Sequence, residues 1–219
     1  MNSIPRIKVN DWVPQQQPTC VGFRKKTDYY EQVCIKHPYN SSFHSRAELY
    51  HAMLLESDSS IDSYVPQPYK FRIGRRIYPP DCYLVEGHRR IIRELKPRGD
   101  FEPKWRKQFE DYLRLNRIEF EVVSNEMVLE QEILAENWLT IVRVLARGKY
   151  VDTERREKAL IHEEMPVAGI EFGYFITSHT PTEIEINELT IFRLLHRGLL
   201  KADLTHCPLS FDTWIEPCS

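Results

Sequence analysis

Residues 77–96, IYPPDCYLVEGHRRIIRELK, decide the fold of this chain. Two stretches that contain Ile, Tyr, Leu and Val, 77–86 and 90–96, flank the dipeptide Gly87-His88. Stretches of this length around a glycine-containing turn are typical of two antiparallel β-strands. The stretch therefore predicts a β-hairpin.

Charged side chains occupy defined places in this hairpin. Asp81 and Glu94 are expected side by side on the two strands, and Glu94 and Lys96 are two residues apart, so they point to one face. Upstream, Glu48 on a helix could add a third carboxylate. Clustered carboxylates are costly to bury unless a cation joins them, and Mg²⁺ binds through one or two carboxylates plus phosphate oxygens. The pattern favours metal-assisted phosphodiester hydrolysis.

The elements around the hairpin predict the fold class. They are a helix from Ser42 or Ser45 to about 57–60, an extended segment over 61–73, a turn at 74–76, a helix over 102–116, a strand over 118–123 and a helix over 127–147 interrupted near Glu136-Asn137. Successive strands followed by a crossover helix and another strand imply an α/β fold, a mixed sheet flanked by helices.

The two ends of the chain have a different character. Residues 1–40 are rich in Pro, Gln, Lys and Tyr and are expected to be an extension that wraps the domain or a partner. Helices over 153–163 and 181–197, followed by a two-stranded wing within 199–214, predict a small winged-helix-like domain. The expected domains are 1–40, 41–147 and 148–219.

Composition excludes several classes of protein. The 219 residues are 42% hydrophobic and 28% charged, as in folded proteins, and no apolar run approaches the roughly 18 residues of a membrane span. The five cysteines form no CxxC pair, so neither a zinc site nor a disulfide framework is expected. Walker A, GxGxxG and GxSxG motifs are absent. We expect a cytoplasmic protein without a membrane partner.

Charge is distributed unevenly along the chain. Residues 1–150 carry a balance of +4 and residues 151–219 a balance of −6, so the first part could face a polyanion and the second a protein. A basic block covers 89–107 beside the carboxylates, where phosphate contacts are plausible, although such runs are usually solvated faces. The candidate DNA-binding residues are Gln67, Arg89, Arg90, Arg98 and Lys104.

A family resemblance rests on four short motifs. Glu48 on a helix, Gln67-Pro68, Pro80-Asp81 and the ExK at 94–96 together resemble the PD-(D/E)xK restriction-endonuclease-like nucleases. Their spacing, with the helix and strand that follow, is most similar to the TnsA-type endonuclease subunit of heteromeric transposases. The resemblance covers about 41–147, and 148–219 is similar to that family's small C-terminal winged-helix domain.

The resemblance implies a function and its machinery. TnsA-type subunits cut the 5′ strands at transposon ends, while a DDE transposase (TnsB-like) cuts and joins the 3′ ends and an AAA+ regulator (TnsC-like) contacts the C-terminal domain. By position, Glu48, Asp81 and Glu94 would be ligands of Mg²⁺, with Mn²⁺ as a substitute, and Lys96 would be the catalytic lysine. The location implied is the bacterial cytoplasm, beside the nucleoid.

Two alternatives remain open from the sequence. The chain could be another PD-(D/E)xK nuclease, for restriction or repair, that cuts DNA without partners. It could also be a non-catalytic DNA-binding adaptor whose carboxylates merely pair with the basic block. His44, Glu48 and His51 share a helix face, but a dimetal bundle site would need a second copy of Glu48-x-x-His51.

Overall fold

The computed structural model describes residues 6–177 and 180–218, and the chain forms two compact units. Unit 1 consists of the described residues up to Gln32, Lys36–Ala52 and Ser60–Glu130. Unit 2 consists of Val33–Ile35, Met53–Ser59 and the described residues from Gln131 onward. The predicted α/β class is confirmed, because helices and several small sheets alternate along the chain.

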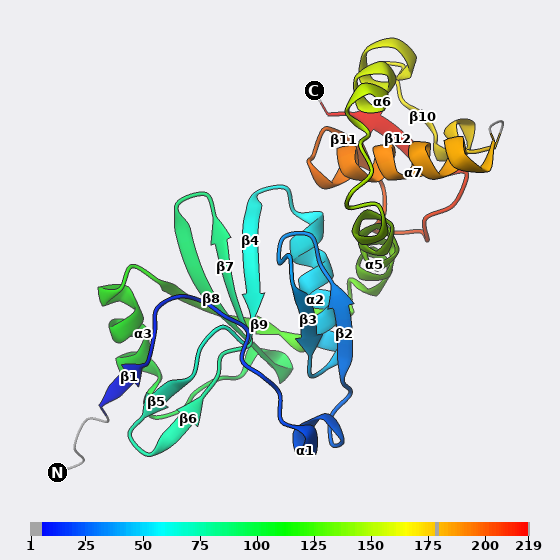
Figure 1. Ribbon diagram of the computed structural model, residues 1–219. Helices are drawn as coiled ribbons and strands as arrows, with labels where there is room; N and C mark the ends of the chain where they lie inside the picture. Colours follow the sequence, from blue (N-terminus) through cyan, green and yellow to red (C-terminus); the bar gives the residue numbers. More distant parts are fainter. Residues whose placement is uncertain (1–5, 178–179, 219) are drawn as a thin grey trace. The chain divides into compact units, whose positions relative to one another are not determined.

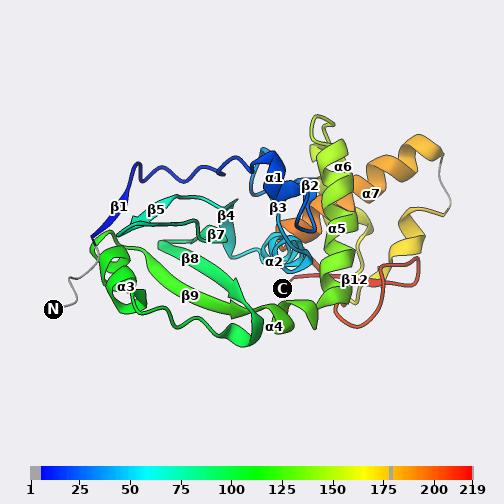
Figure 2. The ribbon, with the colours of Figure 1, turned by 90° about the horizontal axis from the view of Figure 1, so that it is seen from below.

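Unit 1 is built on a four-stranded mixed sheet. Its strand order is β4-β7-β8-β9, with β8 and β9 parallel and the other neighbours antiparallel (Figures 1 and 2). The elements up to Glu130 are β1 (Ile7–Val9), α1 (Val21–Arg24), β2 (Tyr30–Val33), β3 (Asn40–Phe43), α2 (Arg46–Ser57), β4 (Ile61–Pro66), β5 (Phe71–Ile73), β6 (Arg76–Tyr78), β7 (Cys82–Glu86), β8 (Arg89–Lys96), a 3₁₀ turn (Pro97–Gly99), α3 (Arg106–Leu115), β9 (Glu119–Ser124) and α4 (Asn125–Leu129).

The predicted hairpin is confirmed as β7–β8. Gly87 has φ +54°, a left-handed conformation that glycine adopts without a Cβ penalty, and it closes the turn between the two strands. The register pairs Cys82 with Arg93, so Asp81, one residue earlier, stands opposite Glu94. The turn thus fixes which carboxylates become neighbours.

One prediction about this region is wrong: residues 77–86 are not one strand. β6 ends at Tyr78 and belongs to a second sheet with β1 and β5, whereas β7 starts at Cys82 in the main sheet. Pro79 and Pro80 separate them because proline has no N–H to donate to a strand ladder. Two sheets therefore meet at the Pro-Pro-Asp sequence.

Helix α3 covers one face of the main sheet and completes the crossover from β8 to β9. Phe109 and Leu113 of α3 are fully buried against Ile92 of β8 and Phe71 of β5. Phe71 and Phe109 meet edge to face, with ring centroids 4.9 Å apart. This aromatic packing holds the second sheet and α3 on the same side of the hairpin.

The N-terminal extension folds onto unit 1. β1 pairs antiparallel with β5, and Gln15 and Gln17 donate their backbone N–H groups to the carbonyls of Pro68 and Gln67, at 3.1 and 3.0 Å. Residues 10–20, which follow β1, contain bends but no helix or strand. The segment lies over the loop that connects β4 to β5.

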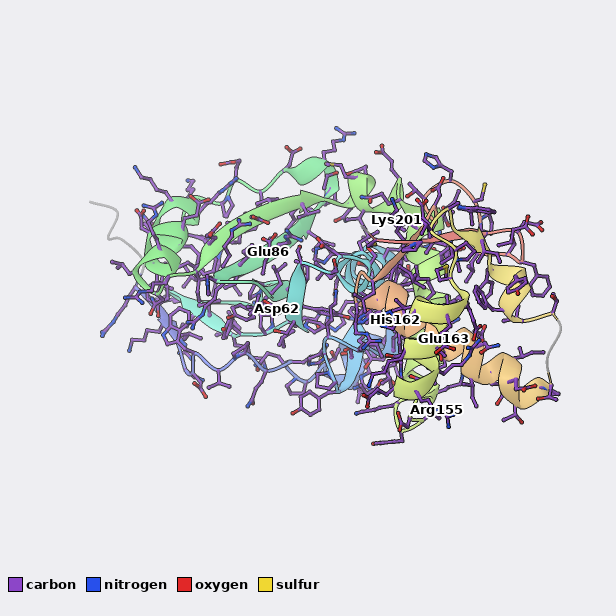
Figure 3. All side chains as sticks on the ribbon, turned by 90° about the horizontal axis from the view of Figure 1, so that it is seen from above. Asp62, Glu86, Arg155, His162, Glu163 and Lys201 are labelled. Carbon is purple, nitrogen blue, oxygen red and sulfur yellow. The ribbon has the colours of Figure 1, made fainter. Side chains whose placement is uncertain are left out.

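Unit 2 consists of helices followed by a small antiparallel sheet. Its elements after Gln131 are α5 (Glu132–Arg147), α6 (Glu154–Ala159) with a π-helical extension (Leu160–Glu164), β10 (Ile170–Glu171), a 3₁₀ turn (Phe172–Phe175), α7 (Pro181–His196), β11 (Leu200–Ala202) and β12 (Trp214–Pro217). Figure 3 labels Arg155 and His162 on the α6 segment and Lys201 on β11. The strand order is β10-β12-β11, one strand more than the predicted wing.

The two main helices of unit 2 show one prediction confirmed and one wrong. The predicted helix over 181–197 is confirmed as α7, and Thr180 caps it through a capping box with Glu183. The break in the preceding helical stretch is at Glu130–Gln131 rather than near Glu136-Asn137. Asn137 stays inside α5 because its buried amide donates to the carbonyls of Leu204 and Cys207, at 2.8 Å each.

Two further findings concern the helices and the cysteines. None of the helices in the described part of the chain has the length and apolar character needed to span a bilayer. All five cysteines lie in the described part and are free thiols.

Candidate active site

Glu48 enters the site from the first turn of α2. Ser45 accepts a hydrogen bond from the Glu48 backbone N–H at 3.1 Å, which caps the helix and starts it at Arg46. The Glu48 carboxylate returns to the chain before the helix, where Oε2 accepts from the His44 N–H at 3.2 Å. The carboxylate thus belongs both to a helix cap and to the site.

Asp81 is held at the junction between the two sheets. Its Oδ2 accepts a hydrogen bond from the backbone N–H of Leu95 on β8, at 2.7 Å. Its carbonyl accepts from the Gln67 N–H at 2.9 Å. The first contact holds the Asp81 carboxylate beside the end of β8, and the second holds the Asp81 backbone.

Glu94 is 2% exposed and both of its oxygens are occupied. Oε1 lies 2.5 Å from Nζ of Lys96, and Oε2 accepts a 2.6 Å hydrogen bond from the Tyr78 hydroxyl. Lys96 shares this face because it follows Glu94 by two strand positions. The buried Glu94 carboxylate is therefore compensated by an ion pair with Lys96 and by a hydrogen bond from the neutral Tyr78 hydroxyl.

Carboxylates outnumber cations in the site, and the pKa values of two of them are raised. Burial raises the pKa of Asp81 well above its ordinary value, and the charges of Glu94 and Glu48 raise it further. Burial also raises the pKa of Glu48 to about 7, with a further increase from Glu94, against the lowering effect of its hydrogen bonds. Such like-charge repulsion is typical of sites that bind a cation or perform acid–base chemistry.

Lys96 remains a cation in this environment. Burial lowers the pKa of its ammonium, but the hydrogen bond with Glu94 and the charges of Asp81 and Glu48 outweigh burial and raise it. The side chain is 34% exposed, so the ammonium reaches the surface while it contacts a buried carboxylate. An ammonium at the surface of the site is accessible to a substrate.

Gln67 connects the site to the N-terminal segment. Its Nε2 donates to Glu48 Oε2 at 2.6 Å, and its Oε1 accepts from Nε2 of Gln16 at 2.8 Å. Gln16 is itself fixed on Ser42, whose carbonyl accepts from the same Nε2 at 2.7 Å. The Gln67 backbone has φ +40°, which is unfavourable for a residue with a Cβ and indicates a position held by its surroundings.

A small cavity of about 10 Å³ adjoins Glu48 and Asp81. His51 lines it, and its buried Nε2 has no hydrogen-bond partner among the described residues. Burial lowers the pKa of His51 to about 3, with a smaller effect from Arg93, so the ring is neutral at physiological pH. His51 therefore contributes no charge to balance the carboxylates.

The donor chemistry of the site fits a hard divalent cation. Carboxylate oxygens are the ligands that Mg²⁺ prefers, and Oδ1 of Asp81 accepts no hydrogen bond from the described residues. No three His, Cys, Asp or Glu side chains in the described part of the chain are arranged as a ready-made metal cage. Mg²⁺ needs only one or two carboxylates when substrate phosphates and waters complete its shell.

The five candidate DNA-binding residues have different environments. Gln67 is buried inside the site. Arg89 is engaged with Glu86, Glu119 and Glu121. The remaining three, Arg90, Arg98 and Lys104, are exposed and form no ion pair with a described residue.

Two residues of the site have no counterpart in the sequence-based prediction. The sequence predicts Tyr78 within a longer strand, whereas two prolines separate it from β7 and its hydroxyl reaches Glu94. Gln16 contacts Gln67 across 51 residues of sequence, and no local sequence pattern predicts such a contact.

Comparisons with known proteins add no assignment: no protein-family model matches the sequence, and no curated protein matches it significantly.

Proposed function

We propose that the protein is a metal-dependent DNA endonuclease of the PD-(D/E)xK type. The observation that carries this proposal is the grouping of the buried Glu94 with the partly buried Asp81 and Glu48 around a single ammonium, that of Lys96. A purely structural cluster gains nothing from an excess of buried negative charge. An excess that a divalent cation neutralises is the arrangement that phosphodiester hydrolysis requires.

The roles follow from the contacts of each residue. Asp81 and Glu48 would hold the cation, and Glu94 would join them when its contact with Lys96 loosens. A bound Mg²⁺ would supply Lewis-acid activation of the phosphodiester and of a water. Lys96 would orient the attacking water or stabilise charge on the phosphorus centre, and Tyr78 would fix the orientation of the Glu94 carboxylate.

The finer proposal follows the family resemblance. Within it, the sheet β4-β7-β8-β9 with α2 and α3 is the restriction-endonuclease-like core, and the α7-β11-β12 segment is a winged-helix-like module. The chain would be the TnsA-type subunit that cuts the 5′ strands at transposon ends in the cytoplasm. Its partners would be transposon-end DNA, a DDE transposase and an AAA+ regulator, the last bound by the acidic C-terminal part.

The test is strand-mapped cleavage of transposon-end DNA in a mixture with the cognate transposase and regulator. Wild type and Asp81→Ala are compared, and joining of the 3′ ends by the transposase is the internal control. Asp62→Asn is a matched carboxylate control, since Asp62 is exposed on β4 of the same sheet, next to Glu86 of β7 (Figure 3). We expect 5′ cuts with wild type and Asp62→Asn and none with Asp81→Ala.

Other outcomes separate the alternatives. Cleavage of generic DNA by the isolated protein would favour a stand-alone restriction or repair nuclease. The occupation of both Glu94 oxygens by Lys96 and Tyr78 favours the adaptor alternative. Joining without any 5′ cut, together with no Mg²⁺ or Mn²⁺ binding that depends on Asp81, would establish the adaptor and end the nuclease proposal.

A further inference from the structure

The three-stranded sheet β1-β5-β6 of unit 1 presents an unusually basic surface. Residues 6–10 and 69–79, which form this sheet and its flanks, include no Asp or Glu. They carry six cationic side chains, all exposed: Arg6, Lys8, Lys70, Arg72, Arg75 and Arg76. We name this group the basic sheet.

The register places the cations on a defined face. Lys8 of β1 stands opposite Arg72 of β5, which stands opposite Ile77 of β6. Neighbours in register point to the same side, and Ile77 is 56% exposed, so this row faces solvent. The alternate residues Phe71 and Ile73 are buried, which fixes the direction of the row.

The cations of the basic sheet differ from other cations of unit 1. Arg89, Arg93 and Arg106 each contact a carboxylate at 2.6–2.8 Å. None of the six cations of the basic sheet forms an ion pair with a described residue. Like charges directly opposite one another destabilise a sheet, so the pairing of Lys8 with Arg72 is unfavourable for folding alone.

The basic sheet is also connected to the candidate active site. Tyr78, the last residue of β6, donates its hydroxyl to Glu94 at 2.6 Å. Tyr78 pairs in register with the buried Phe71, so it lies on the buried side of the sheet. The contact therefore joins β6 to the site from the side opposite the cationic row.

We propose that the basic sheet binds the phosphate backbone of double-stranded DNA, the substrate of the proposed nuclease. This inference rests on the proposed function and deepens it, because it names the surface that receives the substrate. Backbone binding by Lys and Arg is independent of base sequence and depends steeply on salt. The exposed row offers the cationic side chains of Lys8 and Arg72 for such contacts.

The test measures binding without cleavage, so that it does not depend on catalysis. A fluorescent duplex is titrated with the full-length protein in EDTA at several salt concentrations. The variant Lys8→Gln/Arg72→Gln is compared with Lys107→Gln/Arg114→Gln, which removes the same two residue types from exposed positions of α3. We expect the slope of log K against log salt to become shallower by about 2 in the first variant, and to stay at the wild-type value in the second.

Several outcomes would overturn the inference. These are an unchanged slope in Lys8→Gln/Arg72→Gln, an equal loss in the α3 control, or no duplex binding by wild type. If the first variant unfolds, as judged by Tm, Arg75→Gln/Arg76→Gln at the hairpin end tests the same prediction. Normal binding by wild type with no metal-dependent cutting would contradict the nuclease proposal and leave the binding surface standing.

Discussion

The two ends of the β7–β8 hairpin treat charge in opposite ways. At the turn end, Arg89 contacts three carboxylates, those of Glu86, Glu119 and Glu121, and these four side chains are 31–52% exposed. At the other end, the buried Glu94 contacts the partly exposed Lys96, and Asp81 lies beside them with a strongly raised pKa. One strand, β8, carries both arrangements.

The difference separates a structural from a functional use of charge. At the turn end the charges of the Arg89 cluster each have a partner and are partly exposed to water, so these ion pairs contribute little to stability. At the Asp81 end, negative charges exceed positive ones in a buried place, which lowers stability unless a ligand compensates. Natural sequences tolerate such local conflicts mainly at functional sites.

The largest effect is expected from Asp81→Asn, which tests whether the buried end is catalytic. The change should reduce cleavage by at least about 10³-fold, because it removes a ligand and a negative charge from the reacting centre. Tm of the metal-free protein should not fall, since the substitution relieves repulsion. Cleavage assays and thermal melts are done together, and equal nicking by mutant and wild type would remove Asp81 from the site.

Lys96→Ala is expected to have the next largest effect. Loss of a positioned cation at the phosphorus centre should lower the cleavage rate by about 10²-fold or more. Metal affinity, measured by calorimetry, should change much less, because ammonium groups do not ligate metals. If metal affinity falls as far as the rate, Lys96 is a structural residue that positions Glu94.

The pH dependence of stability should distinguish the two ends of the hairpin. The pKa of Glu48 rises from 4.5 to about 7 on folding, so the folded protein holds a proton that the unfolded chain releases. This contribution is present below the unfolded pKa and is lost as pH rises through the folded pKa. The metal-free protein should therefore lose stability between about pH 5 and pH 8.

Glu48→Gln should reduce this loss by about 1–3 kcal/mol, because the amide does not titrate. Urea unfolding in EDTA at the two pH values gives the measurement. Identical pH profiles for the two proteins would show that Glu48 is ionised in the folded state. Arg89→Gln serves as the control from the turn end and should leave the profile unchanged.

A smaller effect is expected at Gln16, which touches the site only through Gln67. Gln16→Met removes the amide that orients Gln67, and loss of one such hydrogen bond should lower the cleavage rate about 2–10-fold. The effect should vanish in a Gln67→Met background if Gln16 acts through Gln67. Gln17→Met is the matched control, because its side-chain amide contacts only backbone carbonyls.

The smallest effect belongs to the turn end itself. Arg89→Gln breaks contacts with three exposed or half-exposed carboxylates, and such surface pairs contribute little in water and less in salt. Tm at moderate salt should change by less than about 2 °C, and cleavage by less than about twofold. A large loss of cleavage would show that the two ends of β8 are coupled.

The sequence by itself determined the local elements and the central hairpin. Gly87-His88 predicted the turn, residues 77–86 and 90–96 predicted the strands around it, and Ser42 or Ser45 predicted a helix start. These features follow from backbone preferences and periodicity, which act over a few residues. The proximity of Asp81, Glu94 and Lys96 was predictable because a two-residue turn at Gly87-His88 sets the register between the two strands that it joins.

Only the tertiary structure decided how this site is completed. The separation of β6 from β7 sends Tyr78 to Glu94, and the folding back of residues 10–20 brings Gln16 to Gln67. The basic sheet likewise arises because β1 pairs with β5 across more than 60 residues of sequence. Such contacts depend on which distant surfaces pack together, and a pattern that repeats every two or four residues contains no information about them.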